Sequence, residues 1–108
     1  RCGLSLDTLV AILRSSSGAS WMLENHVRFK ALAGNHEPGF ALDLMFKDLS
    51  LFLQTATEVQ VPAFIAGTVQ QIYNAARAAG HGALDQTVVA REMEKLAHIE
   101  LGTLTPDV

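Results

Sequence analysis

The 108-residue sequence contains too little cysteine and too few long apolar runs for several protein classes. Its only cysteine, Cys2, excludes a disulfide within the chain and any zinc site built from several cysteines. Such sparing use of cysteine fits a reducing compartment, so we expect a cytoplasmic protein. No apolar run approaches the roughly 20 residues that a membrane-spanning helix needs, and the start lacks the pattern of a signal peptide. We therefore expect a soluble chain with no membrane partner.

Positive charge is also scarce. Lysine and arginine number 8 against 11 acidic residues, which gives a formal net charge of -3, and no basic run stands out. A nucleic-acid binder or a protein that docks on anionic lipid needs such a run, so neither partner is expected. The four histidines have no metal-ligand spacing with each other or with Cys2, so we predict no metal site and expect the histidines on the surface.

The first third of the chain predicts one clear helix and one weaker helical segment. Ser5 is a good N-cap, and apolar residues follow it at helical spacing, which predicts a helix over about 6–15. Ser20 can cap a second segment, either one helix or two short ones, that ends before Gly34. The Pro-Gly pair within 35–39 predicts a turn.

Three more helices are expected after that turn. The strongest pattern runs from Phe40 to Val59, and Pro62 suits the first turn of the next helix, which Gly80 stops. A last helix is expected to start near Asp85 or Thr87. The side chains that this pattern predicts to be buried are Leu42, Met45, Leu49, Phe52, Leu53, Ala56, Ile65, Val69, Ile72, Tyr73, Ala76, Val89, Met93, Leu96 and Ala97.

The fold class that follows is all-α. Nothing in the sequence predicts a strand, and an apolar share of 49% is enough to fill one core, so we expect a single bundle-like domain of about five helices over 1–108. The tail over 102–108 is expected to be flexible. The chain opens at Arg1 rather than at a methionine, which suggests that it was cut from a longer protein.

Two side chains in the Phe40–Val59 helix are candidates for chemistry. Lys47 follows Asp43 by four residues, and taken alone this spacing indicates an ordinary surface pair. Asp48 has apolar helical neighbours, and a carboxylate on such a face needs a hydrogen-bond partner. It is therefore either a structural residue that ties down a neighbouring loop or part of a site. The serines of 15–20 are explained by capping, and the glycines around His81 by a helix stop.

The stretch from Gly39 to Leu51, GFALDLMFKDLSL, resembles the "GF…KDL.L" helix of the β-hydroxyacid dehydrogenases. That family includes 3-hydroxyisobutyrate dehydrogenase and tartronate semialdehyde reductase. Residues 3–7 and 16–21 resemble the family's "GLD" helix start and "SSG…SW" loop, in the same order. Residues 61–87 resemble its "P…Y..A...G.G..D.S" ending, with Thr87 in place of the usual serine. The resemblance covers nearly the whole chain, up to about residue 101.

The resemblance implies the C-terminal half of a two-domain enzyme related to 6-phosphogluconate dehydrogenase. A Rossmann domain, missing from this chain, would bind NAD or NADP, and a lysine upstream of this chain would act as the acid/base group in hydride transfer on a small β-hydroxy acid. Within this chain the resemblance implies that Lys47 helps to bind the cofactor and that Phe40 and Asp48 line the substrate cleft. It places no catalytic residue here, so the chain alone is expected to be inactive and to bind no cofactor.

Two further expectations concern an alternative function and the oligomeric state. The alternative function is a non-catalytic helical interaction or assembly module. We also expect a homo-oligomer, because the helices carry wider apolar faces than one packing contact uses and a missing interdomain helix would leave such a surface open.

Overall fold

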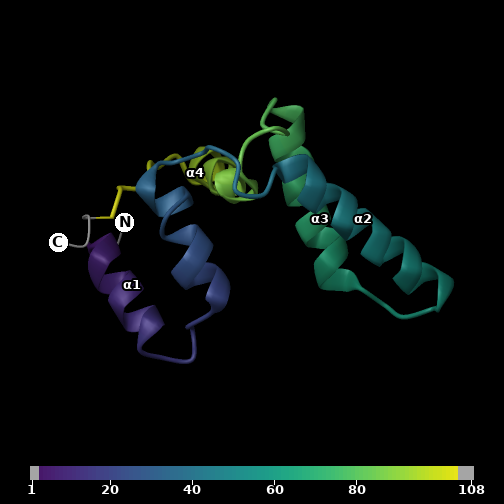
Figure 1. The fold of residues 1–108 in the computed structure, drawn as a ribbon, viewed down its shortest axis with the longest axis horizontal. Helices are drawn as coiled ribbons and strands as arrows, with labels where there is room; N and C mark the ends of the chain where they lie inside the picture. The colour runs from purple at the N-terminus through teal and green to yellow at the C-terminus, as the bar shows by residue number, and fades with distance from the viewer. Residues whose placement is uncertain (1–2, 105–108) are drawn as a thin grey trace.

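The computed structural model describes residues 3–104, and this part of the chain is helical (Figure 1). Its only β contact is a single antiparallel bridge between Ala41 and Asp85. The expected all-α class is therefore confirmed. The elements in chain order are α1 (Leu6–Arg14), the π-helix η1 (Leu23–Val27), the 3-10 helix η2 (Ala31–Ala33), α2 (Leu42–Glu58), α3 (Phe64–Ala78), the 3-10 helix η3 (Gln86–Val89) and α4 (Ala90–Ala97).

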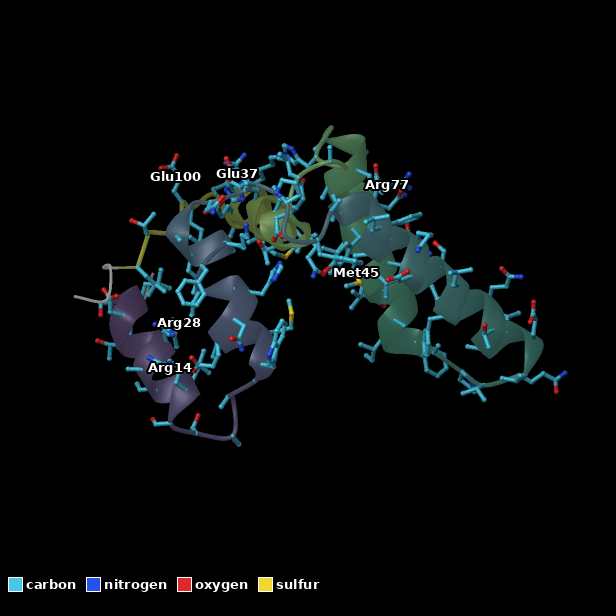
Figure 2. The ribbon with its side chains drawn as sticks, viewed as in Figure 1. Arg14, Arg28, Glu37, Met45, Arg77 and Glu100 are labelled. Carbon is cyan, nitrogen blue, oxygen red and sulfur yellow. The ribbon has the colours of Figure 1, made fainter. Side chains whose placement is uncertain are left out.

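The N-terminal arm consists of α1, η1 and η2. The Ser5 hydroxyl caps α1 by accepting from the Thr8 amide at 3.2 Å, and the Ser20 hydroxyl accepts from the Leu23 amide at 3.0 Å. Both predicted caps are confirmed, and the weaker segment is divided into two short helices. Figure 2 shows Arg14 on α1 and Arg28 after η1, and both contact Glu24, at 2.6 Å and 3.1 Å. The Arg14–Glu24 pair connects α1 to η1, whereas the Arg28–Glu24 pair lies within one turn at η1.

The second arm is the antiparallel hairpin of α2 and α3 (Figure 1). The prediction that Pro62 lies in the first turn of α3 is wrong, because α3 begins at Phe64. Gln60 adopts the left-handed conformation, and the Val61 amide donates to the Ala56 carbonyl at 2.8 Å. These two features end α2, and the chain is not helical again until α3 begins at Phe64.

A small core lies beside α4, where α2 and α3 meet η3. Leu42, Ala76 and Val88 are fully buried there, with Tyr73, Leu84 and Val89 packed around them. The arms diverge from this joint, so the molecule measures 48 × 32 × 26 Å. Its radius of gyration is 15.3 Å, against about 13 Å for a compact domain of this length.

Several side chains that were predicted to be buried are exposed. Phe52 is 56% exposed, Ile65 79% and Leu96 75%, and Met93 is also exposed. The helical period correctly assigned each of them to an apolar face. The prediction of burial was wrong because no other element of the described chain covers those faces.

The tail expected to be flexible lies largely outside the described residues. Residues 102–104 contain no helix, and the Leu104 amide donates to the Leu32 carbonyl at 2.8 Å. None of the helices in residues 3–104 is long and apolar enough to cross a membrane.

Candidate functional site

Asp85 is the polar centre of the joint and is fully buried. Its carboxylate accepts hydrogen bonds from the amides of Gly39, Phe40 and Thr87 at 3.0, 3.2 and 3.0 Å, and from the Thr87 hydroxyl at 2.6 Å. The His26 Nε2 atom lies 2.9 and 3.1 Å from the two carboxylate oxygens. A buried carboxylate needs such partners to offset the loss of its hydration. Asp85 therefore connects the N-terminal arm, the start of α2 and η3.

These hydrogen bonds also determine the charge state of Asp85. Burial raises the pKa of the group, but the opposing hydrogen bonds from the Thr87 hydroxyl and from the amides of Thr87, Phe40 and Gly39 outweigh it and lower the pKa to about 2. Asp85 is thus ionised at neutral pH. Burial of the Tyr73 hydroxyl, together with the negative charge of Asp85 nearby, raises the pKa of Tyr73.

The start of α2 is fixed by backbone contacts with the segment before η3. The amides of Leu42 and Asp43 donate to the carbonyls of Leu84 and Gly82 at 2.8 and 2.9 Å, and the Gln86 amide donates to the Phe40 carbonyl at 2.8 Å. Ala41 supplies no side-chain cap, so these bonds replace one. A Cβ atom at position 82 would overlap the Asp43 carboxylate as it stands, so a side chain there would require the Asp43 side chain to move.

Lys47 and Asp48 form an ion pair on the outer face of α2, with Nζ and Oδ1 3.1 Å apart and side chains 60% and 49% exposed. The predicted surface pair between Asp43 and Lys47 is wrong. Asp43 is bonded instead to Arg77 of α3 at 2.6 Å, and Arg77 also lies over the Phe46 ring, 4.1 Å from its centre.

The face around this ion pair is apolar and uncovered. Leu44, Leu51 and Phe52 are all exposed on it, and helical spacing places them beside Asp48. The sequence had left open whether Asp48 ties down a loop, and the structure gives that role to Asp85. The third predicted site residue, Phe40, is half-buried and is held through its backbone amide and carbonyl.

Asp85 was noticed in the sequence only as a possible start of the last helix. The local signal is the Asp-x-Thr pattern, in which an aspartate accepts from the amide two residues later. Its other partners lie 45 to 59 residues away in sequence, and no local pattern reveals them. For the same reason the expectation that the histidines lie on the surface is wrong for His26, whose side chain is 13% exposed. His36 and His81 are also partly buried.

The residues present can hold a dinucleotide in part. Lys47 has an exposed ammonium group that is paired with the exposed carboxylate of Asp48, so it can also meet a phosphate or ribose oxygen. The apolar side chains beside it can cover a ring. Among residues 3–104, no group of three or more histidine, cysteine or acidic side chains lies close enough together to ligate a metal ion.

Comparison with known proteins gives consistent results. Residues 1–93 match the family described as NAD-binding of NADP-dependent 3-hydroxyisobutyrate dehydrogenase. The chain is 33% identical over 101 residues to 2-(hydroxymethyl)glutarate dehydrogenase of Eubacterium barkeri, which covers 94% of this chain and 34% of that protein. It is 33% identical over 91 residues to L-threonate dehydrogenase of Escherichia coli K12, with coverages of 84% and 30%.

A solved structure agrees with these relatives. The crystal structure of 3-hydroxyisobutyrate dehydrogenase from Salmonella typhimurium superposes with a TM-score of 0.75 at 32% identity, over 83% of this chain and 31% of that one. The chain spans about a third of the length of the proteins it matches. The resemblance seen in the sequence is confirmed, and NAD(P) is the cofactor of the matched family. The chain belongs to the β-hydroxyacid dehydrogenase family and matches the part of it that is described as NAD-binding.

Proposed function

We propose that this chain is the C-terminal helical domain of a two-domain, cytoplasmic NAD(P)-dependent oxidoreductase that acts on a small β-hydroxy acid. The observation that carries the proposal is the outer face of α2, where Lys47 and Asp48 lie among uncovered apolar side chains. Coverage of a third of each relative supports it, since the Rossmann domain of such an enzyme would account for the rest.

Each predicted site residue has a role that suits its position. Lys47 offers its ammonium group to a phosphate or ribose oxygen of the dinucleotide, and Asp48 holds that ammonium group in place from the next position. The backbone at Phe40 is fixed by its hydrogen bond to Asp85, so little conformational entropy is lost when the Phe40 ring covers the cleft. The ring then excludes water from the cleft. When bound, the cofactor accepts or donates a hydride, and the acid/base lysine of the reaction belongs to the other domain.

Replacement of Lys47 tests the assignment. In the full-length enzyme, we expect Lys47→Ala to raise the KM for the dinucleotide about tenfold, with a much smaller change in kcat, because the role is binding rather than proton transfer. Lys95→Ala is the matched control, since Lys95 is equally exposed but pairs with Glu92 on α4. An unchanged cofactor KM in the Lys47 variant would refute the assignment.

Asp48→Asn separates a site role from a structural one. Asp48 is half exposed, so we expect the substitution to leave the unfolding midpoint of the enzyme almost unchanged. A carboxylate that lines the cleft should instead change kcat/KM for the hydroxy acid. If turnover with that substrate stays at the wild-type value, Asp48 is a surface residue.

The alternative function is a non-catalytic helical assembly module, and the exposed apolar side chains favour it as well. Both proposals include a homo-oligomer, and neither expects dehydrogenase activity from the 108 residues alone. They differ in the full-length protein, because only the dehydrogenase reduces or oxidises NAD(P) with a hydroxy acid present. Calorimetry on the isolated chain is expected to show no dinucleotide binding, since one lysine supplies far less than the roughly 8 kcal/mol of a micromolar complex.

A further inference from the structure

The segment that precedes α2 is held differently on the two sides of Phe40. Figure 1 shows this segment crossing from the N-terminal arm to the α2–α3 hairpin. On the far side, the Phe40 carbonyl and the first two amides of α2 pair with backbone atoms of 82–86. On the near side, the amides of Gly39 and Phe40 both donate to a side chain, at the Oδ1 atom of Asp85. The position of the chain just before α2 therefore depends on what holds Asp85 Oδ1.

His26 of η1 reaches this segment in two ways. Its Nε2 atom lies 2.9 Å from Asp85 Oδ1, the same oxygen that accepts from the amides of Gly39 and Phe40. Its ring also lies against the backbone, since a Cβ atom added at Gly39 would be 3.2 Å from His26 Cε1. His26 thus holds the shared oxygen and limits the space into which Gly39 can shift.

Lys30 supports the same stretch from the same arm. Its Nζ atom donates to the Glu37 carbonyl at 2.8 Å, and its Cε atom would lie 3.3 Å from a Cβ atom added at Gly39. Two side chains of the N-terminal arm therefore contact the backbone immediately before Phe40. The arm has a direct route by which its position is passed to that ring.

The contact between His26 and Asp85 requires a hydrogen-bond donor. Asp85 is ionised at neutral pH, and an ionised carboxylate can only accept, so the Nε2 atom of His26 carries the hydrogen. Hydrogen bonds to a charged acceptor are about twice as strong as neutral ones. A glutamine at position 26 could supply an N–H group in the place of Nε2, whereas a leucine could not.

We propose that His26 is a positioning residue of the enzyme, which acts through Asp85 and Gly39 to hold Phe40 at the substrate cleft. The inference rests on the role proposed above for Phe40, and it assigns no contact between His26 and the substrate. Removing the His26 donor should leave the backbone bonds at the start of α2 in place, because they do not use the Asp85 side chain. The chain before α2 would gain freedom, and a small displacement of a group in a cleft is costly for turnover.

Kinetics of the full-length enzyme test the proposal. We expect His26→Leu to lower kcat/KM for the hydroxy acid about tenfold and to leave the KM for the dinucleotide within about twofold of wild type. His26→Gln restores an N–H group and should recover kcat/KM to within about threefold. Val10→Ala is the matched control, since Val10 is buried in the same arm. It should lower the unfolding midpoint without changing kcat/KM.

Hydrogen exchange gives a readout that does not depend on turnover. In His26→Leu the amides of Gly39 and Phe40 should exchange about tenfold faster, and those of Leu42 and Asp43, which are bonded to backbone carbonyls, should keep their rates. Unchanged exchange at Gly39 and Phe40, or an equal increase at all four amides, would overturn the proposal. So would a loss of kcat/KM that His26→Gln does not restore.

Phe40→Ala separates this inference from the proposed function. If Phe40→Ala lowers kcat/KM and the folded His26→Leu variant does not, the positioning role of His26 is wrong and the role of Phe40 stands. If neither variant changes kcat/KM, the proposed role of Phe40 is wrong, and the inference fails with it. A loss in both variants, with His26→Gln active, is the expected result.

Discussion

The joint around Asp85 and the outer end of the α2–α3 hairpin are opposite environments within one chain. We call this outer end, with the exposed side chains Val59, Val61, Phe64 and Ile65, the hairpin end. At the joint the buried carboxylate of Asp85 accepts hydrogen bonds from three backbone amides and from the Thr87 hydroxyl. Leu42, Ala76 and Val88 form a fully buried cluster there. At the hairpin end Phe64 and Ile65 are almost wholly in solvent. The comparison teaches that the joint specifies the fold within the chain, whereas no other element of the described residues covers the hairpin end.

Loss of the Asp85 carboxylate should have the largest effect on stability. Asp85→Ala leaves three backbone amides and His26 without their acceptor in a buried place, so we expect the free energy of unfolding to fall by about 3 kcal/mol or more. Urea unfolding measures it. Asp43→Ala is the control, because it removes an exposed ion pair and should cost less than about 1 kcal/mol. Equal costs for the two variants would show that the joint is not the centre of the fold.

Acid should weaken the joint within a defined pH range. A carboxyl group whose pKa is lowered by folding stabilises the protein above its unfolded pKa, and that contribution is lost as the pH falls through the folded pKa. For Asp85 the range runs from about 4 down to about 2. Over it we expect the wild-type chain to lose about 2 kcal/mol that the Asp85→Asn variant does not lose. Urea titrations of both proteins at pH 5, 3 and 2 measure the difference, and a constant gap between them would contradict the prediction.

A glycine in each region gives the smallest effect and sharpens the comparison. Gly67 lies within α3 with open space around it, so Gly67→Ala should raise the free energy of unfolding of the monomer by about 0.5 to 1 kcal/mol. Gly80 follows α3 at a φ of 86°, so Gly80→Ala should lower it by about 1 kcal/mol. Thermal unfolding at submicromolar concentration measures both. A loss of stability in the Gly67 variant would contradict the open space that the structure shows around this position.

Local features of the fold were predictable from the sequence. Ser5 and Ser20 were recognised as caps because a cap bonds to an amide only three residues away. The helical period likewise identified the apolar faces of α2 and α3. It could not tell that Phe52 and Ile65 are exposed, because a period shows which residues share a face and not whether anything covers it.

The candidate site was harder to predict from the sequence. Lys47, Asp48 and Phe40 were proposed through a family resemblance, and nothing in their spacing alone specified a cofactor contact. Asp85 was missed as a centre because its partner His26 is 59 residues away, and such a contact depends on how the arms pack. Its neighbour Thr87 was the one local sign.

The long sequence separation between Asp85 and its partners has a consequence for the order of folding. The turn of the α2–α3 hairpin is closed between Val61 and Ala56, and its two helices are joined by side chains 20 and 34 residues apart. The joint requires Asp85 to find donors 45 to 59 residues before it. Closing a longer loop costs more conformational entropy, so contacts of this kind form late. On the ribosome the hairpin can therefore assemble as soon as α3 emerges, while the two arms stay unconnected until η3 has also left the exit tunnel. During that interval the apolar faces of both arms are open to chaperones.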